Sequence, residues 1–126
     1  MSVKAMVIDD EPMMTKLLDL VIRDNVTDDV RCFNDPSEAF LALMTEKVDF
    51  ISLDHHMPQM TGTTLLKILR SVDGPNQKTP VLIFTAYIDE VKKHGVDMYE
   101  NVLFLSKPIQ DEKYLRNVKF AIEMNN

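Results

Sequence analysis

Four places in this 126-residue sequence carry side chains suited to phosphoryl or metal chemistry, each at or just beyond the end of a short apolar run. They are two adjacent acids, a single acid, a hydroxyl and an amine: Asp9 and Asp10, Asp54, Thr85, and Lys107. A carboxylate can act as a nucleophile, a hydroxyl can donate a hydrogen bond, and a lysine stabilises negative charge. The set contains the parts of a phosphoryl-transfer site with an aspartate as acceptor.

The three carboxylates also predict a cation. Three aspartates held close together repel one another unless a positive ion lies among them. Magnesium prefers oxygen ligands and commonly binds through one or two carboxylates plus a phosphate, which fits aspartates without nearby thiols. We therefore expect Mg²⁺ as the cofactor. Asp54 taken alone remains ambiguous, because an aspartate at a strand end also serves as a turn residue.

The elements that must bring these residues together alternate along the chain. Five short apolar runs read as strands, near residues 3–8, 30–33, 50–53, 81–84 and 102–105. Helical patterns lie between them: the first stripe is Met14, Leu17, Leu18, Val21 and Asn25, and Asp35 begins the second helix as its N-cap. Such alternation predicts an α/β fold with a parallel sheet and helices on both faces. The carboxyl ends of parallel strands share one edge, which is where ligands bind.

The segment 88–101 is the hardest to assign. Its helical pattern is weak, and Gly95 fits either the end of a helix or an interior position.

Composition limits the class of protein. The chain has 14 basic and 20 acidic residues and a net charge of −6, which argues against binding to nucleic acid or an anionic membrane. Its single cysteine, Cys32, has apolar neighbours and is expected to be buried and unreactive. No apolar run approaches the roughly 20 residues of a membrane helix. We expect one cytoplasmic domain, residues 1–126.

The motifs together resemble a response-regulator receiver domain of the CheY-like kind. The resemblance runs from Val3–Pro12, which includes the acidic pair, through Leu53-Asp54-His55-His56-Met57-Pro58-Gln59-Met60-Thr61-Gly62 and Phe84-Thr85-Ala86 to Ser106-Lys107-Pro108. It implies a flavodoxin-like, doubly wound (βα)5 sheet with strand order 2-1-3-4-5. It also implies a signalling switch of two-component systems, and not an enzyme acting on other substrates. The sequence departs from the family at 94–101, which lacks the usual Gly-Ala just ahead of the last strand, so we expect a short or displaced fourth helix.

The resemblance assigns roles at the acidic site. Asp54 would accept a phosphoryl group from a histidine kinase or a phosphotransfer protein. Asp10 and Asp54 would bind Mg²⁺ directly, with the backbone carbonyl of His56 as a further ligand and Asp9 acting directly or through water.

The resemblance also assigns the residues around the phosphoryl group. The hydroxyl of Thr85 and the amide of Ala86 would hold phosphoryl oxygens, and Lys107 would pair first with Asp54 and then with the phosphate. A cis bond between Lys107 and Pro108 is expected, as similar receivers have it.

Two further pairs follow from the resemblance. Thr85 and Phe104 would be the switch residues, moving on phosphorylation so that the surface of the fourth helix, fifth strand and fifth helix changes its affinity for a downstream protein. Phe104 also fits a plain core residue. His56 and Tyr87 carry bulky rings at the entrance for the hydrolytic water, and we expect them to prolong the lifetime of the phosphate.

Other interpretations deserve weight. His55 and His56 beside Asp54 suggest a transition-metal hydrolase, but adjacent side chains in extended backbone point apart. His94 is expected to be solvated. A flavodoxin would need a phosphate-binding loop where the acidic pair stands. A receiver fold that only binds partners without phosphorylation remains open. Because little sequence follows the last helix, we expect action through protein contacts and no output domain.

Overall fold

A parallel sheet of five strands lies at the centre of the computed structural model, which describes residues 2–124. The strands follow the order β2-β1-β3-β4-β5, so the predicted order is confirmed. Their bounds are β1 Lys4–Ile8, β2 Asp29–Phe33, β3 Phe50–Leu53, β4 Val81–Thr85 and β5 Val102–Ser106. Of the three inner strands, β3 and β4 are buried along their whole length and β1 is buried except at its first residue, as expected for a sheet covered on both faces.

The strand register aligns the carboxyl ends. Ile8 pairs with Leu53 across β1 and β3, so Asp9 and Asp54 each follow a paired residue. Thr85 pairs with Ser106 across β4 and β5, one residue before Lys107. The sheet therefore delivers the acid, hydroxyl and amine groups to one edge, as the alternation of elements predicted.

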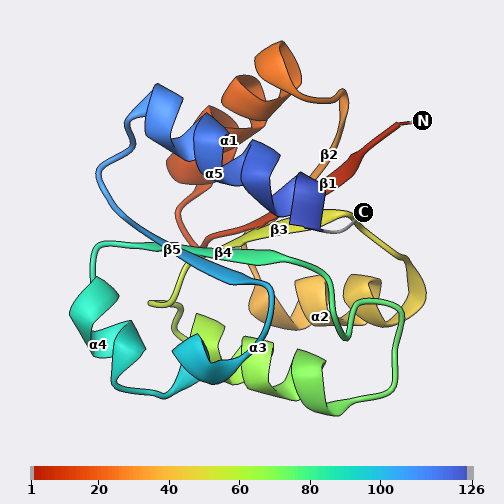
Figure 1. Ribbon diagram of the computed structural model, residues 1–126, viewed down its shortest axis with the longest axis vertical. Helices are drawn as coiled ribbons and strands as arrows, with labels where there is room; N and C mark the ends of the chain where they lie inside the picture. Colours follow the sequence, from red (N-terminus) through yellow and green to blue (C-terminus); the bar gives the residue numbers. More distant parts are fainter. Residues whose placement is uncertain (1, 125–126) are drawn as a thin grey trace.

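Helices cover both faces of the sheet (Figure 1). On one face lie α1 Pro12–Asn25 and α5 Asp111–Met124, which pack around Val7, Phe50 and Leu82. On the other face lie α2 Pro36–Thr45, α3 Gly62–Ser71, the short α4 Ile88–Lys92 and a 3₁₀ turn, Val96–Met98. None of the helices in residues 2–124 is long and apolar enough to cross a membrane.

The helices begin where local chemistry favours a start. The side chain of Asp35 accepts a hydrogen bond from the Ser37 amide, and Pro36 occupies the first helical position, as predicted. Thr61 caps α3 by accepting a hydrogen bond from the Thr64 amide at 3.3 Å. The predicted short fourth helix is also confirmed, because Gly95 takes the left-handed conformation (φ 74°) soon after α4 ends.

Two expectations about burial were wrong. Helix α1 buries Leu18 and Ile22, whereas Leu17 is 38% exposed. Each residue turns the helix by about 100°, so a helix centred on Leu18 directs Leu17 sideways and brings Ile22 into the core. Cys32 is exposed rather than buried, because it lies on β2 at the edge of the sheet. Its Sγ donates weakly to the carbonyl of Thr15 at 3.6 Å.

Candidate functional site

The acidic residues converge with Lys107 at the carboxyl edge of the sheet. One carboxylate oxygen from each of Asp9, Asp10 and Asp54 lies within 4.8 Å of the other two. Nζ of Lys107 donates to Oδ2 of Asp9 at 2.8 Å and lies 3.6 Å from Oδ2 of Asp54. Asp9 and Asp54 are buried, with 1% and 5% of their surface exposed. The donor atoms are all oxygens, which fits a hard divalent cation.

The buried position of Asp54 destabilises its charge. Burial and the negative charge of Asp9 raise the pKa of the Asp54 carboxyl above its usual range. Lys107 and hydrogen bonding from the His55 amide, whose nitrogen lies 2.8 Å from Oδ1, act in the opposite direction without cancelling the rise. A cation bound at this edge would lower the pKa of the Asp54 carboxyl and favour its ionised, nucleophilic form.

Lys107 is held between two carboxylates. Burial lowers the pKa of its amine, but the hydrogen bond and charge of Asp9, with the charges of Asp54 and Glu11, outweigh burial and raise the pKa overall. The lysine therefore stays protonated. Nζ of Lys107 lies closer to Asp9 than to Asp54. The expected ion pair with Asp54 is therefore present, but it is the longer of the two contacts.

Backbone contacts hold the two loops that carry Lys107 and Asp54 at the carboxyl edge of the sheet. The Lys107–Pro108 bond is cis, as expected, and the amide of Lys107 donates to the Thr85 carbonyl at 2.9 Å. On the other side, the Gly62 amide donates to the His55 carbonyl at 2.9 Å. A Cβ on Gly62 would lie only 2.1 Å from the carbonyl oxygen of Asp54, so the loop after β3 closes only over a glycine.

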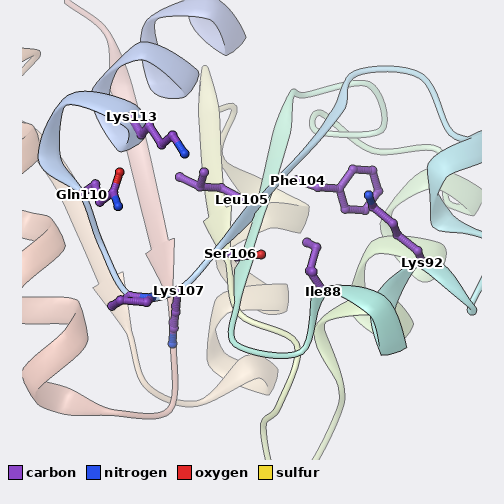
Figure 2. A pocket seen from close by; sticks show the side chains of 9 residues that line it. Ile88, Lys92, Phe104, Leu105, Ser106, Lys107, Gln110 and Lys113 are labelled. Atoms are coloured by element: carbon purple, nitrogen blue, oxygen red, sulfur yellow. The ribbon is translucent and has the colours of Figure 1, made fainter.

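The expected switch residues lie on adjacent strands. Thr85 is fully buried, and its hydroxyl accepts a hydrogen bond from the Tyr87 amide at 3.2 Å. Phe104 is partly buried against the core, with Nζ of Lys92 at 5.8 Å from its ring centre. Figure 2 shows Phe104 and Lys92 at a pocket of roughly 400 Å³, which Lys107 and Lys113 also line.

The two rings expected at the entrance contact each other. The ring centres of His56 and Tyr87 lie 4.3 Å apart, and Nε2 of His56 lies 3.5 Å from Oε2 of Glu90. Tyr87 is 51% exposed, so this ring pair lies at the surface of the protein.

Two features escaped the sequence analysis. His94, expected to be solvated on its own, lies beside His55, with ring centres 5.3 Å apart. Asn76 is fully buried and donates to the carbonyls of Leu43 and Glu46, each at 2.7 Å. Both placements depend on segments distant in sequence, and no local pattern indicates them.

Comparison with known proteins establishes the family. The model of the response regulator receiver domain matches residues 5–119, so the chain belongs to that family. Receiver domains are signalling switches that interact with a kinase or another phosphodonor, and they typically bind Mg²⁺ at an acidic pocket.

Among curated relatives, the DNA-binding response regulator MtrA of Mycolicibacterium smegmatis is 26% identical over 97% of this chain and 51% of its own length. A response regulatory protein of Vibrio vulnificus is 32% identical over 91% of this chain and 46% of its own length. The chain thus spans about half the length of the curated relatives it matches.

Solved structures agree with the architecture. The receiver domain of Francisella response regulator 1452 is 27% identical, with a TM-score of 0.80 and 98% of each chain covered. The chemotaxis protein CheY4 of Vibrio cholerae is 24% identical, with a TM-score of 0.85 over 96% of this chain and 99% of its own. The latter likeness shows the CheY-like fold.

Proposed function

We propose that this chain is a phosphorylatable receiver whose acceptor is Asp54. The donor would be the phosphohistidine of a histidine kinase or a phosphotransfer protein, and the reaction would require Mg²⁺. The observation that carries the proposal is the convergence of three carboxylates and Lys107 around one buried strand-end aspartate. Burying like charges together is costly, and such clusters of perturbed carboxylates gather at functional sites.

The reaction would be a displacement at phosphorus. A carboxylate oxygen of Asp54 forms the new bond to phosphorus, while the bond from phosphorus to the donor imidazole breaks and the imidazole leaves with a proton. The product is a mixed anhydride of the aspartate and phosphate. Because the transition state spreads negative charge over the phosphoryl oxygens, groups that neutralise or hydrogen-bond those oxygens accelerate it.

The chain offers such groups on both sides of Asp54. Lys107 places its ammonium 3.6 Å from the carboxylate and provides positive charge. The hydroxyl of Thr85 and the amide of Ala86 would donate to phosphoryl oxygens. Asp9, Asp10 and Asp54, with the backbone carbonyl of His56, would hold Mg²⁺. When bound, this ion neutralises part of the oxygens' charge.

The output would be a change in the α4-β5-α5 surface. A donor that moves toward the new phosphoryl oxygens stabilises one of two loop arrangements, so phosphorylation shifts a population. Thr85 would move inward and Phe104 would follow, altering affinity for a downstream protein. The chain's own chemistry would be limited to accepting the phosphoryl group and hydrolysing it slowly.

The decisive experiment is the intact mass of the protein after incubation with a small phosphodonor and magnesium. The wild type should gain one phosphate and Asp54→Asn none. Asp73→Asn is the matched control, because it removes the same charge at an exposed position outside the site, and it should gain one phosphate. Removing magnesium with a chelator should abolish the gain. An unmodified wild type would identify a binding module that is not phosphorylated.

A further inference from the structure

Beside the acidic site lies a second cluster of possible metal ligands, made of His55, Glu90 and His94. One ligand atom from each of the three lies within 4.8 Å of the other two. His55 follows Asp54 in the loop after β3, whereas Glu90 belongs to α4 and His94 to the turn after it. The cluster therefore joins two segments that are more than thirty residues apart in sequence.

The imidazole of His55 is the anchor of this cluster. His55 is only 2% exposed, and the Nδ1 atom of its ring is buried without a hydrogen-bond partner among the described residues. A buried polar atom left without a partner costs about 1–3 kcal/mol. Such an atom calls for an explanation, and a bound ligand at the cluster supplies one.

Glu90 and His94 are placed to complete the site. They are four residues apart. The helical turn continues past the end of α4, because the amide of His94 donates to the Val91 carbonyl at 3.0 Å. This spacing puts both side chains on the same side of the segment, facing His55. Both are exposed, so their rotamers are free to adjust.

We propose that His55, Glu90 and His94 bind a first-row transition-metal ion of the zinc class. Two imidazoles and one carboxylate are ligands that such ions favour, and magnesium does not prefer imidazole. At tetrahedral zinc, with bonds of about 2.0–2.1 Å, neighbouring ligand atoms lie about 3.4 Å apart. Small rotations of the exposed Glu90 and His94 side chains close the present separation, and water occupies the fourth position.

The ion would tie α4 to the loop that carries the residue after Asp54. This segment of the chain is short, ends at a left-handed glycine and is otherwise held by few regular hydrogen bonds. Zinc would therefore restrain the part of the α4-β5-α5 surface nearest the acidic site. That consequence for signalling rests on the proposed function, whereas the binding itself does not.

Isothermal titration of the unphosphorylated protein with zinc chloride, in millimolar magnesium to compete at the carboxylate cluster, tests the proposal. The wild type should bind one zinc ion, and His94→Ala and Glu90→Gln should each weaken binding by about tenfold or more. Asp89→Asn, which removes the same charge from the adjacent position of α4, should stay within about twofold. The primary variants alter exposed side chains, so folding is preserved.

Imidazole nitrogen spectra provide an independent readout. Stoichiometric zinc should shift the ring signals of His55 and His94 together. The proposal is overturned if the wild type binds no zinc or if His94→Ala binds it unchanged. It is also overturned if Asp10→Asn, and not His94→Ala, weakens binding, since zinc would then occupy the acidic site. None of these results depends on phosphorylation, so failure here leaves the proposed phosphoryl transfer untouched.

Discussion

At the scale of single residues, the contact between His56 and Tyr87 leads to a prediction about the rate at which the aspartyl phosphate is hydrolysed. Their rings lie 4.3 Å apart, and we expect them to shield a phosphorylated Asp54 from water. We expect replacement of both by serine to shorten the lifetime of the aspartyl phosphate by about tenfold, equivalent to about 1.4 kcal/mol of barrier. Loss of phosphate from the isolated protein, followed by intact mass, gives the rate.

The two single variants show how much each ring contributes to the lifetime of the phosphate. If the two rings shield the site together, either His56→Ser or Tyr87→Ser should give most of the acceleration. Asp89→Asn changes a neighbouring exposed residue and should leave the lifetime unaltered. An unchanged lifetime in the double variant would remove the shielding role.

Cys32 provides a residue-scale prediction about pH. Partial burial of its sulfur and the charge of Asp19 raise the thiol pKa from 9.0 to about 11, although Arg23 acts in the opposite direction. Only the thiolate reacts, so at pH 8 alkylation should be about a hundredfold slower than for an ordinary thiol. The rate should rise about tenfold per pH unit until it levels near pH 11.

Alkylation by iodoacetamide across this pH range measures the titration. Asp19→Asn removes one cause of the raised pKa and should speed the reaction at pH 8. Asp24→Asn removes the same charge from an exposed position of α1 and should have little effect. Rapid wild-type alkylation at neutral pH would contradict the expected pKa.

At the scale of elements, the loop from β3 to α3 depends on Gly62. A Cβ there would lie 2.1 Å from the Asp54 carbonyl oxygen and 3.0 Å from Cα of His55, both backbone atoms that cannot rotate away. We therefore expect Gly62→Ala to lower the free energy of unfolding by roughly 2–4 kcal/mol, despite the better helix propensity of alanine. Urea denaturation followed by circular dichroism measures the loss.

Gly74→Ala is the matched control for this substitution. Its added Cβ would meet only the flexible side chain of Met44, with the nearest atom at 3.4 Å. The expected change is below about 1 kcal/mol. Equal stability of the two variants would show that the loop adjusts without cost and that Gly62 does not fix the backbone beside Asp54.

The elements also show which features sequence alone can predict. Strand positions followed from apolar runs bounded by turn residues, and the shared site edge followed because parallel strands end together. The exact face of α1 did not follow, since Leu17 and Leu18 are equally apolar and only packing on the sheet selects Leu18. The role of Asn76 was equally hidden: it satisfies backbone groups of Leu43, Glu46 and Val48 that lie about thirty residues earlier.

The candidate site divides in the same way. Asp9, Asp54 and Lys107 were predictable because each stands at a strand end, where position follows from topology. The closer contact of Lys107 with Asp9 than with Asp54 was not predictable. Its Nζ lies 2.8 Å from Asp9 and 3.6 Å from Asp54, and so small a difference depends on side-chain packing. The proximity of His94 to His55 depends on the path of residues 88–95, the segment with the weakest helical pattern.

At the scale of the whole molecule, three lysines line a pocket on the α4-β5-α5 surface of an acidic protein. The chain carries a net charge of −6, yet the pocket on this surface is lined by Lys92, Lys107 and Lys113 (Figure 2). Lysines on an otherwise acidic protein favour approach of an acidic partner to this side, and such steering weakens as salt increases. The surface also adjoins the site directly, because Lys107 contributes to both.

The proposed switch would link the acidic site to this surface, and it predicts a change that crosses the molecule. A stable phosphate mimic at Asp54, such as beryllofluoride with magnesium, should displace Thr85 toward the new acceptor atoms and leave room for Phe104 to follow. Amide signals should therefore shift across residues 85–107, with the largest changes from Thr85 to Ile88 and around Phe104. Strand β2 lies at the opposite edge of the sheet from β5. The amide signals of β2 and of the C-terminal half of α1 should therefore change little.

Phe104→Leu separates the switch from binding of the mimic. Leucine keeps an apolar side chain against the core but removes the ring beside Lys92, so the mimic should still bind while the shifts near Lys92 shrink. Unchanged signals from 85 to 107 in the wild type, with the mimic bound, would disprove the switch. Full wild-type shifts in Phe104→Leu would instead assign the transmission to Thr85 and the α4 segment, because Phe104 would then act only as a core residue.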